Sequence, residues 1–339
     1  MEKSILWEAA MYYIASPSTD PKWNLALEQY AFDTLSLRDS ILMLWQNDNT
    51  IVAGKNQNIA AEVDEQFVRE HGISVVRRLS GGGTVYHDLG NLNFTFITPS
   101  GGNDKIDFRT FCLPIIETLA SFGVKAELSG RNDMTVDGKK FSGNAQYLRD
   151  GRVMHHGTLM FSSDLTVLSR ALTVNREKLR SKGVASVASR VTNLAPYLPA
   201  GTAMEEFKSR LVEHLSAAAP LVPYALTAED KAAIETIKHS RYDLWEWNYG
   251  LSPAFETKYA QRFEGVGTVE ASVSVKGGRF AALAFTGDFF GSGEASELAS
   301  HLLGCERTRE SVLAALSGID LDHFIRNMTR EQLAELLVP

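Results

Sequence analysis

The amino-acid sequence predicts an α+β fold in which a mixed, mostly antiparallel sheet is flanked by helices. Two pairs, Asp137-Gly138 and Asp150-Gly151, stand between strand-like segments, and an Asp-Gly pair suits the positive backbone dihedrals of a tight hairpin turn. We therefore expect an antiparallel meander over residues 131–161. Alternating apolar residues over 92–96 predict a further strand, and helical patterns stand on both sides of this region.

The segments before the meander are predicted as a mixture of helices and short strands. Leu25, Leu27 and Tyr30 place apolar surface around a helix over residues 23–37, which Pro21 precedes. The other predicted elements are strands at 41–45 and 50–53, a polar helix at 64–71, strands at 75–78 and 84–87 beside a glycine turn, and a helix at 108–122 that contains Pro114.

Two helices and a group of prolines follow the meander. The helices are predicted at 204–218 and 228–239, and the second begins with an approximate capping box of Thr227 and Asp230. Pro220, Pro223 and Pro253 lie in the region after the first of these helices. We place a domain boundary within residues 245–255, which predicts a larger domain over residues 1–247 and a smaller one over 248–339.

The smaller domain is predicted to be α+β as well. Apolar residues alternate over 268–276, Gly277-Gly278 makes a turn, and residues 280–285 return as a second strand. Helical stretches run from residue 294 onward, and Thr329 with Gln332 caps the last of them.

Composition limits the classes of function. The net charge of -7 and the sequence pI of about 5.7 give no electrostatic footprint for nucleic acid or an anionic membrane. Residues 1–10 lack the pattern of a signal peptide, and we identify no apolar run of membrane-spanning length. Cys112 and Cys305 are too far apart in the sequence to form a CxxC pair. We expect a cytoplasmic protein.

The first segment that carries chemistry reads RRLSGGGTVYHDLGN and spans residues 77–91. Three consecutive glycines allow a tight turn whose N–H groups can approach an anion, and the flanking arginines suit phosphate or carboxylate. The segment is neither a Walker loop nor a GxGxxG motif. An ordinary glycine turn between strands remains an alternative at this point.

The second segment spans residues 130–145. Asp133 and Lys140 fall on either side of a hairpin turn, so a carboxylate suited to magnesium and an ammonium group could face one polyphosphate. A solvated, structural lysine is the alternative.

Two further segments contain histidine and basic residues. His155 and His156 are adjacent in a predicted strand and should project to opposite faces, so only one can face a site. A metal centre of His87, Asp88 and His156 is conceivable, although buried histidines bonded to the backbone are commoner. Residues 175–193 are basic and contain a glycine, as expected of either solvated surface or a mobile loop over a nucleotide.

Together these segments resemble the lipoate-protein ligase A family. Its pattern of RRxSGGGxVxHDxGN, then GRND with a downstream K-x-SG-x-A, then HHGTL and SRVTNL is present in this order. Residues 245–250 and 253–255 resemble the junction to the family's accessory domain. The resemblance implies a large catalytic domain like that of biotin and lipoate ligases, a small α+β accessory domain, and ATP-dependent activation of lipoate as an acyl-adenylate.

The resemblance also implies roles for particular residues. Lys140 matches the lysine that contacts both the acyl carboxylate and the α-phosphate, and a fixed ammonium there would offset the repulsion of two anions without acting as a base. The nucleotide would be held by Arg78, Gly83, Thr84, Val85 and Tyr86 as well as Lys140. The lipoyl pocket would be lined by Leu25, Leu27, Trp45, Ser80, His87 and His156 in addition to Lys140.

The remaining implied roles concern magnesium and a closing loop. Asn91 and Asp133 would supply hard oxygen ligands for Mg2+. Lys178, Lys182 and Arg190 belong to a stretch that corresponds to the family's adenylate-binding loop, which would shield the mixed anhydride from water. The implied acceptors are apo lipoyl domains, namely 2-oxoacid dehydrogenase E2 subunits and the glycine cleavage H protein, and we expect a monomer.

Three other functions compete with ligation. An octanoyl transferase of the same fold would need a cysteine nucleophile, and Cys112, in an apolar helical pattern, is the candidate in the larger domain. A non-catalytic binding module would not need the lysine, the glycine turn and the basic stretch. A biotin ligase is disfavoured because the glycine segment and HHGTL follow the lipoate pattern.

Overall fold

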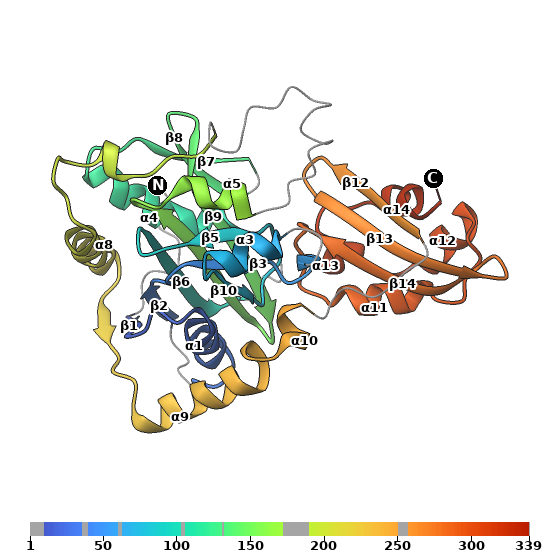
Figure 1. Ribbon diagram of the computed structural model, residues 1–339, viewed down its shortest axis with the longest axis horizontal. Helices are drawn as coiled ribbons and strands as arrows, with labels where there is room; N and C mark the ends of the chain where they lie inside the picture. The colour runs from blue at the N-terminus through green and yellow to red at the C-terminus, as the bar shows by residue number, and fades with distance from the viewer. Residues whose placement is uncertain are drawn as a thin grey trace. The chain divides into compact units, whose positions relative to one another are not determined.

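The computed structural model describes residues 10–35, 40–59, 63–102, 106–130, 132–171, 190–249 and 257–338, which divide between two compact units (Figure 1). The large unit comprises Met1–Val52, Glu62–Val76 and Val85–Leu244, and the small unit comprises Ala53–Ala61, Arg77–Thr84 and Trp245–Pro339. The small unit thus contains most of the glycine segment together with the C-terminal residues. The described residues include no helix that is long and apolar enough to cross a membrane.

The large unit is built on an eight-stranded sheet with the order β11-β1-β2-β6-β10-β9-β8-β7. The strands are β11 (Leu221–Pro223), β1 (Met11–Ala15), β2 (Ser40–Trp45), β6 (Asn91–Pro99), β10 (Arg152–Met160), β9 (Lys139–Arg149), β8 (Asp133–Val136) and β7 (Ala126–Ser129). Only β1 pairs in parallel, with both β11 and β2, and the other neighbours are antiparallel. The predicted mixed, mostly antiparallel sheet is therefore confirmed.

The two hairpins of the meander form at the predicted Asp-Gly pairs. Asp137 and Gly138 have φ of 50° and 70°, and Asp150 and Gly151 have φ of 52° and 70°. Positive φ at both central residues matches the right-handed twist of the adjoining strands. These turns set the register of β8, β9 and β10, and the meander extends one strand further than predicted, to β7.

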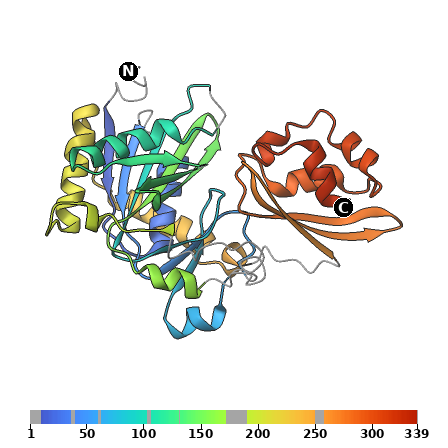
Figure 2. The same cartoon turned by 90° about the horizontal axis from the view of Figure 1, so that it is seen from above.

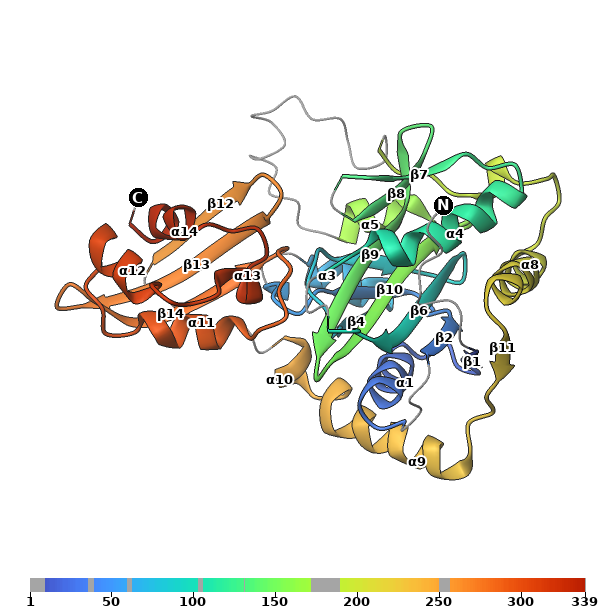
Figure 3. The ribbon, with the colours of Figure 1, turned by 180° about the vertical axis from the view of Figure 1, so that it is seen from behind.

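Helices cover both faces of this sheet (Figures 2 and 3). Helix α1 (Pro21–Asp33) lies on one face and packs against α9 (Ala228–Ile237). On the other face lie α4 (Arg109–Ser121) and α8 (Met204–Ala218), which contact each other. Each predicted helix of this unit has a counterpart, but the helix predicted over 23–37 ends at Asp33, and residues 36–37 of that prediction lie outside the described residues.

A second sheet and several short elements lie mostly in the large unit, although Ala53 and Arg77 at the ends of two strands belong to the small unit. The sheet has the order β4-β3-β5, formed by β4 (Ser74–Arg77), β3 (Thr50–Ala53) and β5 (Val85–His87). The remaining elements are α3 (Glu65–Glu70), α5 (Leu165–Ala171), η2 (Ala195–Tyr197) and η3 (Lys238–Tyr242).

The C-terminal part of the small unit forms a three-stranded antiparallel sheet with helices packed on it. Its elements are α10 (Trp245–Asn248), β12 (Thr257–Phe263), β13 (Gly267–Lys276), β14 (Arg279–Gly287), α11 (Ala295–Leu302), α12 (Arg309–Ala315), α13 (Leu321–Phe324) and α14 (Arg330–Leu337). Strand residues Val269, Val273 and Phe285 share one hydrophobic core with helix residues such as Leu298 and Leu333. The predicted α+β character is confirmed, and the predicted boundary between residues 247 and 248 stays a prediction.

Arg77 joins distant segments of the small unit from a fully buried position, with 0% of its surface exposed. Its guanidinium donates to five backbone carbonyls, those of Gly54 (2.9 Å), Lys55 (2.8 Å), Gln57 (2.7 Å), Trp247 (3.0 Å) and Asn248 (3.1 Å). The indole N–H of Trp247 returns a hydrogen bond to the Arg77 carbonyl (2.9 Å). A buried charge is tolerated here because five dipoles point their negative ends at it.

We expect Arg77→Lys to lower the free energy of unfolding by about 2 kcal/mol or more. An ammonium has three donors and lacks the planar guanidinium that bonds both residues 54–57 and residues 247–248. Arg149→Lys is the matched control, since Arg149 is 42% exposed and pairs with Asp33 at the surface, where exchange should cost less than about 1 kcal/mol. Urea denaturation followed by tryptophan fluorescence measures both. Equal losses in the two variants would contradict a structural role specific to Arg77.

Candidate functional site

A buried chain of hydrogen bonds connects α1 to the sheet at β2, β6 and β10. The indole N–H of Trp45 donates to the Thr95 hydroxyl (2.9 Å), which donates to Glu28 Oε1 (2.5 Å). The Nδ1–H of His156 donates to the same carboxylate oxygen (3.0 Å). Glu28 is 1% exposed and Thr95 is fully buried. Because a buried carboxylate needs donors, this network fixes the orientation of both the Trp45 and the His156 ring.

The two adjacent histidines point to opposite faces, as predicted. His156 contacts Glu28 on α1, whereas the ring of His155 stacks on Phe111 of α4 with centroids 4.9 Å apart. His155 accepts from Gln146 Nε2 (2.9 Å) through Nδ1 and donates to Asn144 Oδ1 (3.3 Å) through Nε2, which is the neutral form of the ring. Burial, and secondarily His156, holds the pKa of His155 well below its ordinary value. His155 therefore has a structural role.

His87 lies on the same side of the sheet as the Trp45 network. Its ring meets Trp45 edge-on, with centroids 6.0 Å apart, and its Nδ1 accepts from Asn47 Nδ2 (3.2 Å). Within the described ranges, no three histidine, cysteine or acidic side chains gather so as to hold a metal ion, so the alternative centre of His87, Asp88 and His156 has no support there. The structure instead places Trp45, His87 and His156 around one region of the sheet.

The two predicted leucines occupy different faces of α1. Both are buried, with Leu25 2% and Leu27 0% exposed. Leu25 precedes Glu28 by one helical turn and so shares the face that turns to the sheet. Leu27 stands one turn before Tyr30, whose hydroxyl donates to Asp230 on α9 (2.6 Å). The helical spacing therefore puts Leu25, rather than Leu27, on the face of α1 that carries Glu28.

Lys140 and Asp133 meet across the β8–β9 hairpin. Their ion pair is 2.7 Å long, and each side chain is about one third exposed, at 35% and 36%. The Lys140 side chain lies over Gly143, where a Cβ atom would stand only 3.1 Å from Nζ. The glycine of the SG pair thus leaves room for the lysine. The hairpin geometry brings this ammonium and carboxylate together, as the sequence predicted.

The end of the predicted adenylate loop is attached to the same strand. Val191 bridges to Lys140, and the Thr192 N–H donates to the Lys140 carbonyl (2.8 Å). Arg190, just before this attachment, is exposed. Lys178 and Lys182 lie outside the described residues. Of the three predicted loop residues, Arg190 is therefore the one that the structure describes, and it directly precedes the residues that pair with Lys140.

Asn91 and Asp133 differ in how they could hold magnesium. Asn91 is buried, and its Oδ1 has no hydrogen-bond donor among the residues that the structure describes, while its Nδ2 donates to Asn93 Oδ1 (2.9 Å). Such an oxygen fits the preference of Mg2+ for hard ligands. Asp133 fits by its chemistry, although its carboxylate is paired with Lys140. The two residues begin β6 and β8, which are separated by β10 and β9 in the sheet.

The glycine segment lies mostly in the small unit and is shaped by Arg78. The Arg78 guanidinium is almost fully buried and donates to Ser80 Oγ (3.0 Å) and to the carbonyls of Gly81 (2.8 Å) and Gly83 (2.8 Å). Thr84 donates to Gln57 Oε1 (2.7 Å) in the same unit. The small unit thus brings together four predicted site residues, Arg78, Ser80, Gly83 and Thr84. The hydrogen bonds of Arg78 hold the backbone of the glycine segment around its guanidinium.

Val85 and Tyr86 continue into β5 of the large unit. The Tyr86 hydroxyl donates to Asn49 Oδ1 (3.0 Å). Burial, followed by the nearby carboxylate of Asp88, raises the pKa of Tyr86 to about 12, so the phenol stays neutral at ordinary pH.

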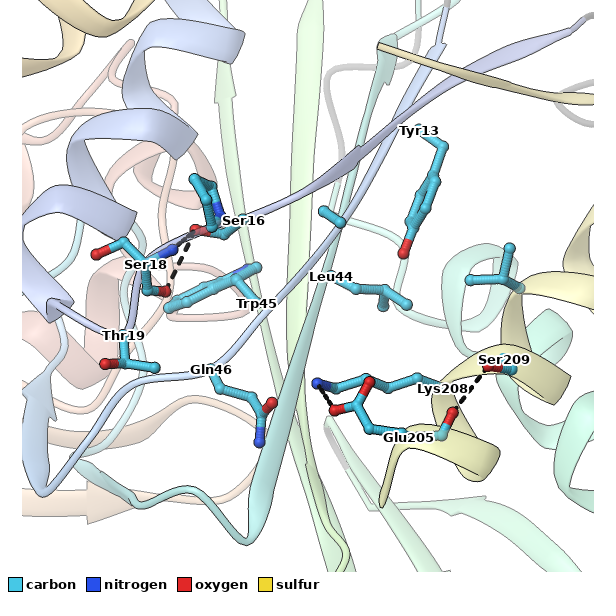
Figure 4. Close-up of a pocket in the computed structure, with 13 residues that line it drawn as sticks. Tyr13, Ser16, Ser18, Thr19, Leu44, Trp45, Gln46, Glu205, Lys208 and Ser209 are labelled. Atoms are coloured by element: carbon cyan, nitrogen blue, oxygen red, sulfur yellow. Dashed lines mark hydrogen bonds and ion pairs between the residues drawn. The ribbon is translucent and has the colours of Figure 1, made fainter. Parts of the chain in front are cut away.

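A surface pocket opens at the end of β2 in the large unit (Figure 4). It is lined by β1, by residues 15–19, and by α8, where Lys208 and Glu205 form an ion pair of 2.7 Å. Trp45 and Gln46 form the side nearest the network described above. Trp45 is the one predicted site residue among the side chains that line this pocket.

Sequence reasoning missed Glu28 and Thr95. The available signal was the acidic Glu28 close to the apolar Leu25, Leu27 and Tyr30 in the predicted helix. Cys112, the possible nucleophile, is fully buried in α4, and burial raises the pKa of its thiol to about 12. A thiol that is so seldom ionised and has no access to solvent is unsuited to attack an acyl group.

Comparison with known proteins gives consistent matches over nearly the whole chain. A family described as the lipoyl protein ligase A/B catalytic domain matches residues 20–216, and one described as the bacterial lipoate protein ligase C-terminus matches residues 252–337. Lipoate-protein ligase LplJ of Bacillus subtilis is 43% identical over 94% of this chain and 97% of its own length. Lipoate–protein ligase 1 of Staphylococcus aureus is 41% identical, with coverage of 94% and 97%.

Solved structures show the same fold. Plasmodium falciparum LipL1 in complex with lipoate has a TM-score of 0.79 at 23% identity, over 97% of this chain and 99% of that one. Lipoate-protein ligase A bound with ATP has a TM-score of 0.61 at 25% identity, over 72% and 100%. The bipartite lipoate protein ligase of Thermoplasma acidophilum has a TM-score of 0.63 at 26% identity, over 74% and 100%.

Because Thr95 links Trp45 to Glu28, we expect Thr95→Val to lower the free energy of unfolding. Valine has the same shape but removes the hydroxyl, so a buried carboxylate and a buried indole N–H each lose a partner, and we expect a loss of about 2 kcal/mol in unfolding free energy. Thr98→Val on the same strand is the control, because Thr98 Oγ1 is buried without a hydrogen-bond partner in the described part of the chain, so valine should be neutral or stabilising. Chemical denaturation that ranks Thr98→Val as the more destabilising change would refute the network.

His155 predicts how stability depends on pH. Its pKa is depressed in the folded protein, so below about pH 6.5 the unfolded chain binds a proton that the folded chain does not. Stability contributed by neutral His155 is therefore present above pH 6.5 and falls by about 1.4 kcal/mol per pH unit below it. In urea titrations between pH 7.5 and 5, His155→Gln should reduce this slope. An unchanged slope in the variant would count against the neutral, buried ring.

Proposed function

Because this chain belongs to the lipoate-protein ligase family, we propose that the residues described above form its lipoate and ATP sites. It is an ATP-dependent lipoate-protein ligase, an enzyme that activates lipoate to lipoyl-AMP with release of pyrophosphate and then transfers the lipoyl group to a lysine of an acceptor protein. The family assignment rests on relatives that match over more than nine tenths of both chains.

In the first step, a carboxylate oxygen of lipoate attacks the α-phosphorus of ATP. A new O–P bond forms, the bond from the α-phosphorus to the bridging oxygen breaks, and pyrophosphate leaves with that electron pair. Both reactants are anionic, so a fixed cation near the reacting atoms lowers the barrier. Lys140 supplies this cation, and the observation that carries the proposal is the placement of its ammonium at the β8–β9 hairpin by Asp133 and Gly143.

In the second step, the amine of the acceptor lysine attacks the carbonyl carbon of the mixed anhydride. The C–O bond to AMP breaks, AMP leaves with that electron pair, and the amine loses a proton to solvent as the amide forms. Lys140 remains close to the phosphate throughout and is not acylated. Arg190 and the rest of the adenylate loop, including Lys178 and Lys182, cover the anhydride and limit its hydrolysis by water.

The lipoyl group occupies an apolar pocket beside the Trp45 network. Leu25, Leu27 and Trp45 line the hydrocarbon chain and dithiolane, while Ser80, His87 and His156 provide polar contacts. The Glu28 carboxylate supports this pocket because it fixes the ring of His156. Arg78, Gly83, Thr84, Val85 and Tyr86 hold the nucleotide.

We propose two oxygen groups for magnesium, and because β10 and β9 lie between the strands that carry them, the ion would reach at least one of them through water. Asn91 Oδ1 and the Asp133 carboxylate would hold it, directly or through the waters that Mg2+ usually retains. When bound, the ion would offset charge on the polyphosphate. Asp133 then has two roles, since it also pairs with Lys140.

We extend the proposal to domains, partners and location. Residues 1–247 form the catalytic domain and residues 248–339 the accessory domain. The acceptors are apo lipoyl domains of 2-oxoacid dehydrogenase E2 subunits and the glycine cleavage H protein, and the enzyme works as a cytoplasmic monomer. The buried, high-pKa thiol of Cys112 disfavours a thioester route, so ATP-dependent ligation is the better account.

Lys140→Ala should lower the rate of ATP-dependent lipoylation at least about 100-fold, because the cation between the two anions is lost. Lys139→Ala is a matched control, since Lys139 is the exposed neighbour on the same strand and should retain near-normal activity. The measurement is the lipoyl mass added to an apo lipoyl domain in the presence of ATP, magnesium and lipoate. Normal lipoylation by Lys140→Ala would exclude the proposed role of the lysine.

A further inference from the structure

The glycine segment is packed against a loop that follows the last strand of the C-terminal sheet. The Gly82 N–H donates to the carbonyl of Phe289 (3.2 Å), and the Gly287 N–H donates to the carbonyl of Asn56 (2.8 Å). Lys55 and Glu294 add an ion pair of 2.5 Å. All of these residues belong to the small unit, so residues 54–57 and 80–83 are held by the C-terminal part of the chain.

These contacts are so close that they explain why two of the three positions, 81 and 82, need glycine. A Cβ atom on Gly81 would stand 2.6 Å from the Phe289 carbonyl oxygen, and one on Gly82 would stand 2.9 Å from Cε1 of Phe290. Gly82 also has φ of +90°, a conformation that other residues rarely adopt. The glycines at 81 and 82 are therefore needed to seat the loop on Phe289 and Phe290. The Gly82 N–H is already bonded to protein, whereas Gly83 has nearly open space around its Cβ position, with the nearest atom 4.0 Å away.

The two phenylalanines differ in what surrounds them. Phe289 is fully buried and belongs to the hydrophobic core of the C-terminal sheet and helices. Phe290 is 1% exposed but lies outside that core cluster, and its ring lies against Gly82. A large aromatic ring is thus buried at the glycine segment rather than in the core of its own domain. This position suits a residue that shapes the segment.

Arg78 connects this packing to the proposed ligand contacts. Its guanidinium bonds the Gly81 carbonyl, which lies beside Phe289, as well as the Gly83 carbonyl and the Ser80 hydroxyl. A displacement of Gly81 or Gly82 would therefore also displace Ser80 and Gly83. These are the positions that we assign to lipoate and ATP.

We propose that Phe290, together with the Phe289 carbonyl, is a positioning residue of the ligase active site: it holds residues 80–83 in the conformation that binds lipoate and ATP. This inference rests on the proposed function of the glycine segment.

The test compares the kinetics of pyrophosphate release for Phe290→Ala, Phe290→Leu and the wild-type full-length chain. Loss of the ring should leave the glycine segment free to adopt other conformations, so the KM values for ATP and lipoate should rise about tenfold or more in Phe290→Ala, which corresponds to about 1.4 kcal/mol of lost binding. The effect on kcat should be smaller. Leucine restores most of the buried volume and should return both KM values to within about threefold of the wild type.

Two further variants separate positioning from stability. Phe285→Ala removes a ring from the core of the C-terminal domain without touching the glycine segment, so it should lower the melting temperature but leave both KM values unchanged at a temperature where the protein is folded. Gly81→Ala places a methyl group against the Phe289 carbonyl and so disturbs the packing of the glycine segment directly. It should raise both KM values as Phe290→Ala does.

The outcomes distinguish this inference from the proposed function. A wild-type chain without ATP-dependent lipoylation would overturn both. An active wild type in which Phe290→Ala keeps normal KM values, or in which Phe285→Ala raises them equally, would overturn the positioning role alone.

Discussion

Two anions must meet for lipoate to be activated, and we propose that the arrangement around Lys140 meets that constraint. At close range two like charges repel strongly unless a cation lies between them, and the repulsion grows where water is excluded. The hairpin between β8 and β9 places the Lys140 ammonium beside the Asp133 carboxylate, 2.7 Å away, and Gly143 keeps the space that the side chain occupies. In the structure this carboxylate balances the lysine charge. In our proposal the reacting carboxylate and phosphate take over that balance, so the site holds its cation ready without an unpaired charge.

The parts of the fold that sequence predicts are those that local chemistry determines. The Asp-Gly pairs at 137–138 and 150–151 predict both hairpins because positive φ at two successive residues is costly for most side chains. The same turns bring Asp133 and Lys140 together, so this part of the site is predictable too. Strands β1 and β11 are not predicted as partners, because they pair residues 11–13 with residues 221–223 in parallel. No local signal encodes pairing across such a distance.

The parts of the site that sequence misses depend on distant partners. Glu28 meets Thr95 and His156 across 67 and 128 residues of chain, so its role appears only when α1 is laid on the sheet. The glycine segment gives a second example. Its composition suggests an anion-binding turn, whereas the structure shows that Gly81 and Gly82 also accommodate Phe289 and Phe290, and that Arg77 and Arg78 bond backbone carbonyls. A charge pattern predicts the presence of guanidinium groups but not whether they face a ligand or their own loop.

Transfer of an isotope label tests the central claim, attack of the lipoate carboxylate on the α-phosphate, most directly. Lipoate carrying 18O in both carboxylate oxygens is incubated with ATP, magnesium and an apo lipoyl domain, and the nucleotide products are analysed by mass spectrometry. The account predicts one 18O atom in AMP and none in pyrophosphate, because the attacking oxygen stays on the α-phosphorus when the acceptor amine takes the acyl carbon. Unlabelled AMP, or label in a terminal phosphate released with ADP, would contradict it.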